Sequence, residues 1–278
     1  MRAGRKKGSY PLFGEAQAKN GYDPFSMTIG FALLLTLASV VRAQAADITV
    51  LASNGVKTVL AELAPRFEQA TGHRLVFRFG AAAELKAQID NGDAFDVTIL
   101  TAALIDNLIE RGTLAAAGRA DLARSGAGVA IRKGAPRPDI SSAEAFKRTL
   151  LAATSVAIVG QGATAGTMRN IFERLGVAEE MRVKTRMLSG GSAAEAVAGG
   201  EAELGFTQIS EILPVAGAEL AGPLPPGLQV YTVFTAAVNA RARQAEAARR
   251  FIAFLTAPAA AAVIKAKGME PAPARGGR

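Results

Sequence analysis

The chain has 278 residues, of which 50% are hydrophobic and 20% charged, with 32 basic residues, 24 acidic residues and no cysteine. The lack of cysteine excludes a thiolate nucleophile, a cysteine-ligated zinc site and a disulfide framework. The net charge of +8 falls to +4 without the first 45 residues, and no basic run with interleaved aromatic residues indicates a nucleic-acid-binding surface.

Residues 1–45 have the pattern of a secretory signal peptide. Four basic residues stand within the first seven, the apolar run IGFALLLTLASVV follows, and AQA at 43–45 is a small-residue cleavage site. The apolar run is shorter than the roughly 20 residues that span a bilayer as a helix. We therefore predict cleavage before Ala46 and export to the periplasm, with translation starting at Met1 or Met27; an uncleaved anchor is the alternative.

After the signal segment, short apolar runs alternate with stretches of helical periodicity. DITVLA (47–52), RLVFRF (74–79) and FDVTIL (95–100) predict buried strands, and each precedes a stretch with apolar residues at helical spacing. Pro65 lies inside the first of these helices and is expected to kink it. The β-α-β-α-β-α order predicts a parallel sheet covered by helices, whose ligands bind at the carboxyl ends of the strands.

SGAGVAIRKGAPRPDIS (125–141) predicts a strand followed by a proline-rich connection, and a second α/β unit comes after them. It alternates in the same way: strands are expected over 155–160, 183–188 and 203–209, with helices over 146–153, 167–176 and 192–200. The strand 230–240 leads back to the first unit, and the closing helix 245–269 is expected to split at Pro258. We predict lobe 1 at 46–128 plus 236–270, lobe 2 at 129–235, a cleft between them and a disordered tail at 271–278.

The strand-to-helix turns are candidate anion sites, because the first N–H groups of a helix lack internal partners and the helix dipole is positive there. Four turns qualify: ASNGV with Ser53 or Asn54, GAAAE with backbone N–H groups only, GQGATAGT with Gln161, Thr164 and Thr167, and SGGSAAE with the capping-box pair Ser192 and Glu195. Each alone has the form of an ordinary helix cap. Two turns per lobe, facing one cleft, favour an anion-binding site.

The sequence contains few residues that are candidates for a catalytic role. His73 is the only histidine and follows the end of a helix, where a histidine commonly satisfies terminal carbonyl groups. No GxSxG turn is present, and no histidine cluster indicates a metal site. The sequence therefore predicts a binding protein with no catalytic residues, no metal and no cofactor, rather than an enzyme.

Three segments resemble a known family. DITVLASNGVKTVLAELAPRFEQATGHRLVFRFGAAAELKAQIDNGDAFDVTIL, AGGEAELGFTQISEI and ARRFIAFLTAPAAAAVIKAKGME are similar to periplasmic solute-binding proteins of the molybdate ABC transporter family. The resemblance covers 46–270. It implies an α/β fold of the type II periplasmic binding class, with two lobes that close on a tetrahedral oxyanion held by hydroxyl and backbone N–H groups.

The resemblance also implies the ligand-binding residues. They are Ser53, Asn54, Ala81, Ala82, Thr164, Ala165, Gly190 and Gln208. Two positions depart from the family: its second turn is serine-rich where this chain has Ala81, Ala82 and Ala83, and a tyrosine often stands where this chain has Gln208. A hydrogen bond to a charged group contributes roughly 1.5–3 kcal/mol, so these departures are expected to weaken molybdate binding.

The function expected from the sequence is a monomeric receptor of an ABC importer for molybdate or tungstate, which docks on the transporter permease after cleft closure. A second hypothesis keeps the receptor and changes its ligand to sulfate or a small organic acid. An organic acid would usually require an arginine clamp, for which Arg78 and Arg169 are available. Two hypotheses of a different class are an exported enzyme on this fold and a cytoplasmic effector-sensing domain.

Overall fold

The computed structural model describes residues 45–272. The predicted signal segment lies outside the described residues except for Ala45, and so do residues 273–278 of the predicted tail. Pro271, the first residue of that tail, is paired with Ala123 in a short strand.

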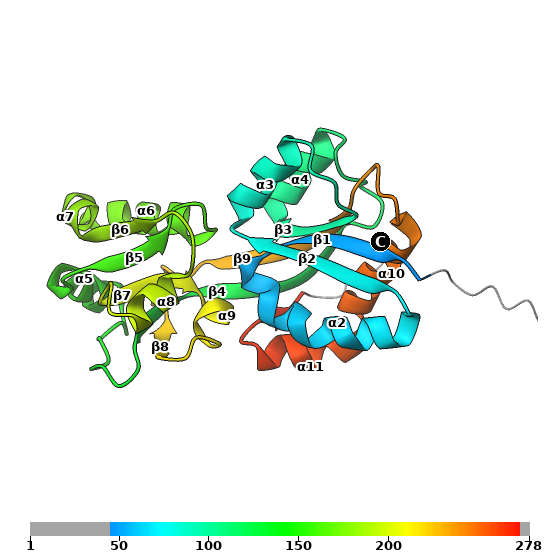
Figure 1. Ribbon diagram of the computed structural model, residues 1–278. Coiled ribbons are helices and arrows are strands. Elements are labelled where there is room, and N and C mark those ends of the chain that lie inside the picture. The colour runs from blue at the N-terminus through cyan, green and yellow to red at the C-terminus, as the bar shows by residue number, and fades with distance from the viewer. Residues whose placement is uncertain (1–44, 273–278) are drawn as a thin grey trace, which may run out of the picture. The chain divides into compact units, whose positions relative to one another are not determined.

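The described residues form two α/β lobes (Figure 1). The first lobe contains β1 (Asp47–Ser53), the 3₁₀ turn η1 (Asn54–Val56), α2 (Lys57–Thr71), β2 (Arg74–Gly80), α3 (Ala82–Asp90), β3 (Val97–Thr101), α4 (Ala102–Glu110), β9 (Tyr231–Val238), α10 (Ala245–Thr256), α11 (Pro258–Ala266) and β10 (Glu270–Pro271). The second contains α5 (Ala143–Ala152), β5 (Val156–Val159), α6 (Thr164–Leu175), α7 (Ala178–Lys184), β6 (Thr185–Leu188), α8 (Ala193–Ala198), β7 (Leu204–Gln208), α9 (Ile209–Ile212) and β8 (Ala218–Pro223). The long strand β4 (Ala120–Arg132) belongs to both.

The strands follow one another in the order β2-β1-β3-β9-β4-β7-β5-β6. β1 pairs in parallel with β2 and β3, and β5 pairs in parallel with β6 and β7, as the β-α alternation predicts. β4 joins the two halves: its residues 120–126 pair with β9 and its residues 127–132 pair with β7 and β8. By this pairing all of β9 lies in the first sheet, and the lobe boundaries at 128 and 235 stay a prediction.

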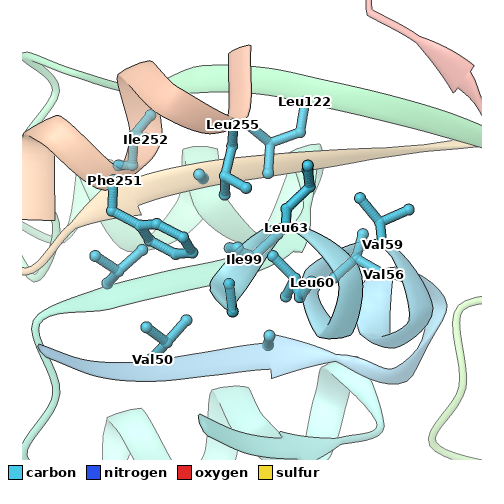
Figure 2. Close-up of a cluster of buried hydrophobic side chains, with 14 of the residues drawn as sticks. Val50, Val56, Val59, Leu60, Leu63, Ile99, Leu122, Phe251, Ile252 and Leu255 are labelled. Carbon is cyan, nitrogen blue, oxygen red and sulfur yellow. The ribbon is translucent and has the colours of Figure 1, made fainter. Parts of the chain in front are cut away.

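The first lobe has its main core between β1, α2 and α10 (Figure 2). The helical spacing of Val59, Leu60 and Leu63 places them on the buried face of α2, in the same hydrophobic cluster as Phe251 of α10. Pro65 is inside α2, which continues without interruption from Lys57 to Thr71. The closing helix splits at Pro258 as predicted, because proline is accommodated at the first turn of a new helix.

The second lobe has a separate core on β7. Phe206 meets Phe146 of α5 and Phe172 of α6 edge-on, with ring centroids 5.9 and 6.3 Å apart. Such tilted aromatic pairs add to the stabilisation that burial alone provides. Each lobe therefore has its own hydrophobic core. Residues of several turns between strands and helices line the cleft.

Several elements differ from the sequence predictions. The strand expected over 183–188 begins only at Thr185, because α7 continues through Lys184. That helix has Glu179 and Glu180 in its first turn and basic residues in its last, an arrangement that the helix dipole favours. β4 begins at Ala120, and β8 and α9 were not predicted; the residues of β8 are mostly alanine, glycine and glutamate, and their pairing with β4 is a tertiary contact.

Among residues 45–272, no single helix is long and apolar enough to cross a membrane, and α10 with α11 reaches that length only as a pair bent by 65°.

The two lobes are tied together at Gly55. A Cβ atom at this position would lie 2.3 Å from the buried ring of Phe234 in β9. The Gly55 carbonyl accepts a buried hydrogen bond of 2.8 Å from the hydroxyl of Ser210 in α9. The turn that opens α2 is thus packed against β9 of its own lobe and hydrogen-bonded to a helix of the second lobe.

We expect Gly55→Ala to destabilise the protein by about 1–3 kcal/mol, because an added methyl overpacks the contact with Phe234. Thermal unfolding should show a Tm lower by several degrees. Gly166→Ala is the control: Gly166 is exposed in α6 with nothing within 4 Å of an added Cβ, so its Tm should stay equal or rise. An unchanged Tm for Gly55→Ala would contradict this packing.

Candidate functional site

A cleft of about 620 Å³ is lined by residues of both lobes, at the carboxyl ends of β1, β2, β5 and β7. Another hollow, of about 680 Å³, lies at the opposite ends of β1 and β3. Two charged groups there have structural partners: Asp96 accepts the backbone N–H groups of Thr49 and Gln244, and Arg111 pairs with Asp90. We take the cleft as the candidate site, because residues at the starts of α2, α3, α6, α8 and α9 line it and because these helices come from both lobes.

The first wall of the cleft is the turn between β1 and α2. Ser53 and Asn54 line it, as predicted from the sequence. The Ser53 side chain is buried but makes no hydrogen bond that caps the following turn, so its hydroxyl is available to a ligand. Lys57, the first residue of α2, also lines the cleft, with its ammonium 5.8 Å from the centroid of the Phe79 ring.

The alanine loop between β2 and α3 forms another part of the wall. Ala81 and Ala82 line the cleft, and no side chain caps α3. The N–H of Ala83 donates to the backbone carbonyl of Gln161 in the other lobe, at 3.4 Å. This loop therefore makes a backbone contact between the lobes, and it needs no side-chain oxygen to do so.

Gln208 and Thr164 form the second-lobe wall. The Gln208 side chain is 3% exposed, and its Nε2 donates to the hydroxyls of Thr164 and Thr232 at 3.1 and 3.0 Å. Its Oε1 has no partner among the described residues. Both amide hydrogens are therefore engaged, and the free atom of Gln208 is a hydrogen-bond acceptor rather than a donor to an oxyanion.

Two of the predicted residues do not line the cleft. Ala165 packs in the second-lobe core, and its N–H already donates to the carbonyl of Gly162. Gly190 is exposed beside the cleft, and its neighbours Gly191 and Ser192 line the cleft instead. The Ser192 hydroxyl caps α8 by accepting the Ala194 N–H, so Ser192 is the N-cap; the reciprocal bond of a capping box, from the Ser192 N–H to Glu195, is not formed among the described residues. The ligand contacts of all eight predicted residues stay a prediction.

Lys57 and Glu211 are charged residues of the cleft that the sequence analysis missed. Lys57 carried a usable signal, because a basic residue in the first turn of a helix opposes the helix dipole and is unfavourable there without another reason. Glu211 carried none, since its place in the cleft depends on α9, a helix of four residues. Neither Arg78 nor Arg169 lines the cleft; Arg78 pairs with Asp93.

Glu211 has an environment that disfavours its charge. Its carboxylate accepts hydrogen bonds from the Thr207 hydroxyl and from the Gln208 backbone N–H. Burial raises its pKa above the ordinary 4.5, against the smaller lowering effect of these two hydrogen bonds. No ion pair of Glu211 is found within residues 45–272. A cleft carboxyl group with a raised pKa is a candidate for proton transfer.

The remaining titratable candidate, the lone histidine, has a structural position. His73 is buried in the first lobe, where its Nδ1 accepts the N–H of Ala46 and its ring stacks on Phe67. No group of three or more histidine or acidic residues within 45–272 is arranged to hold a metal ion.

A two-lobed α/β fold with helix starts around an interlobe cleft defines the class of extracellular solute-binding proteins. The chain belongs to the family described as bacterial extracellular solute-binding protein, whose model matches residues 48–270.

The names of individual relatives indicate different functions, an isomerase in one case and a molybdate-binding protein in another. An aconitate isomerase from a Pseudomonas species is 34% identical over 250 residues, 88% of this chain and 95% of that protein. The molybdate-binding protein ModA of Azotobacter vinelandii is 28% identical over 241 residues, 81% of this chain and 90% of that protein. The solved structure of the periplasmic molybdate-binding protein from A. vinelandii has a TM-score of 0.68 at 22% identity, covering 80% of this chain and 98% of that one.

These comparisons bear on the sequence predictions to different degrees. The predicted family and the type II periplasmic binding fold are confirmed. The relatives are mostly periplasmic binding proteins, which agrees with the predicted class and location. The prediction that the chain is not an enzyme is not confirmed, because one full-length relative is named an isomerase.

We expect Glu211→Gln to gain stability relative to wild type as the pH rises above about 4.5, the ordinary pKa of a glutamate. Above about pH 4.5, Glu211 ionises in the unfolded chain but stays protonated in the folded protein, because its folded-state pKa is higher. The free energy of unfolding of wild type therefore falls with rising pH until the pH passes the folded-state pKa. Glutamine lacks this effect. Thermal unfolding across the pH range, with the exposed Glu180→Gln as control, checks the sign; a wild-type advantage that grows with pH would contradict it.

Proposed function

We propose that this chain binds a small polycarboxylate in the interlobe cleft and interconverts isomers of aconitate. The observation that carries the proposal is the Lys57 side chain in the cleft. The helix starts and the Ser53 hydroxyl supply neutral donors, and Lys57 adds a countercharge that a tetrahedral oxyanion site of the molybdate type does without.

Two further features support a carboxylate ligand. The identity of 34% to an aconitate isomerase extends over nearly the whole of both chains. The cleft volume of about 620 Å³ falls in the usual range for small-molecule sites, roughly 300–1,000 Å³, and leaves room for a six-carbon acid. The organic acid that the sequence offered as the second hypothesis thus becomes the first candidate, with Lys57 in place of the expected arginine.

The second candidate is the function expected first from the sequence: a molybdate or tungstate receptor of an ABC importer that docks on a permease. The 28% identity to a molybdate-binding protein and the neutral donors at Ser53 and the helix starts favour it. The alanine loop without hydroxyls and the engaged amide of Gln208 weigh against it. Both candidates are consistent with an exported periplasmic protein that acts as a monomer.

The test is a ligand and turnover screen of the protein without residues 1–45. With cis- or trans-aconitate at 100 times the dissociation constant, we expect about 2.7 kcal/mol of added stability and a Tm shift of several degrees. Proton NMR of each isomer incubated with the protein should show its conversion to the other. A Tm shift with molybdate or tungstate alone, without conversion of aconitate, would overturn the first candidate in favour of the second.

We expect Lys57→Met to weaken aconitate binding by about 10- to 100-fold, because one charge-assisted interaction contributes about 1.5–3 kcal/mol. Isothermal titration calorimetry measures the change. Lys133→Met is the control: Lys133 is exposed after β4 and does not line the cleft, so its affinity should equal that of wild type. Equal affinity of the Lys57 variant would remove the main support for a carboxylate ligand.

A further inference from the structure

Glu211 is placed where a bound ligand would meet it. It is the third residue of α9, directly after β7, and it lines the cleft together with Ser53, Lys57 and Gln208. The position of α9 is firmly set, because Ser210 donates its hydroxyl to the Gly55 carbonyl of the first lobe. The carboxyl group is therefore held between the two lobes rather than on a mobile surface.

No lysine or arginine among residues 45–272 forms an ion pair with the Glu211 carboxyl group. The other charged residues that line the cleft are Lys57 and Glu195. The hydrogen bond from the Thr207 hydroxyl orients the carboxyl group, as a positioned acid or base requires. Burial raises its pKa and makes it a stronger base when ionised.

We propose that the Glu211 carboxyl group carries the proton in the isomerisation of aconitate, an inference that rests on the proposed function. Aconitate has a central alkene carbon with a CH₂–COO⁻ arm on one side and a =CH–COO⁻ arm on the other. The Glu211 carboxylate removes a proton from the CH₂ arm, and that C–H electron pair forms a new double bond to the central carbon. The electron pair of the former double bond then takes a proton from the Glu211 carboxyl group at the other arm. This is the proton just removed, or a deuteron where the carboxyl group has exchanged with D₂O in the meantime.

This step balances without any co-reactant. One C–H bond breaks and one forms, the double bond moves from one arm to the other, and Glu211 returns to its ionised form. The negative charge that develops next to the carboxylate arms is stabilised by nearby positive charge, which Lys57 and the helix starts supply. A single carboxyl group therefore suffices, and the lack of a histidine in the cleft is no obstacle.

The competing explanation is that Glu211 only caps α9, by accepting the Gln208 N–H. Glu211→Gln separates the two roles, because the glutamine oxygen still accepts hydrogen bonds from Thr207 and Gln208 but the amide cannot shuttle a proton. Glu211→Asp keeps the acid one methylene shorter and should retain partial activity. It provides a second variant should Glu211→Gln fail to fold, and Glu180→Gln on the surface is the control.

The experiment follows cis- and trans-aconitate in D₂O by proton NMR, and it measures aconitate binding by calorimetry for each variant. We expect Glu211→Gln to lower the rates of isomerisation and of deuterium exchange at the CH₂ arm by at least 100-fold, with aconitate affinity within about threefold of wild type. Wild-type turnover with an unimpaired Glu211→Gln variant would overturn this inference alone. Wild-type protein that neither binds nor converts aconitate would overturn the proposed function as well.

Discussion

The contact between Gly55 and Phe234 is the constraint on which the cleft depends. Gly55 lies in the turn that opens α2, and Phe234 lies in β9 of the same lobe. Ser210 of the second lobe donates its hydroxyl to the Gly55 carbonyl. No residue with a Cβ atom fits there without displacing a buried ring. The turn that carries Ser53 and Lys57 and the helix that carries Glu211 are consequently held at one junction, and the site is built around it.

The polar groups of the cleft are of two kinds: neutral hydrogen-bond donors and the charged side chains Lys57 and Glu211. Most of its donors are neutral, being backbone N–H groups and hydroxyls, which suits an anion without selecting a particular one. Lys57 adds a positive charge on the first-lobe side, and Glu211 adds a carboxyl group whose burial raises its pKa. An anion held by the first set of groups would meet a proton-transfer group without any change of fold, and in this way a binding protein can also be an enzyme.

The alanine loop shows how the same turn can serve in different ways. Where the molybdate-binding family has hydroxyls, this chain has Ala81, Ala82 and Ala83, and the backbone of Ala83 bonds to Gln161 across the cleft. Lobe contact therefore rests on main-chain groups, which are independent of ligand chemistry. In our proposal, ligand selection rests on side chains elsewhere in the cleft, and Lys57, Gln208 and Glu211 are the candidates.

The sequence by itself determined the parallel β-α order, the split at Pro258 and the family. Of the eight residues predicted for the site, six line the cleft. These features could be predicted because hydrophobic periodicity and turn chemistry are local. Only the tertiary structure decided what meets across the cleft. α9 and β8 are held by contacts with distant segments, the Ser210–Gly55 bond joins residues 155 positions apart, and the orientation of the Gln208 amide depends on Thr164 and Thr232. Glu211 therefore escaped prediction, since burial and partners, which no local pattern encodes, set its pKa.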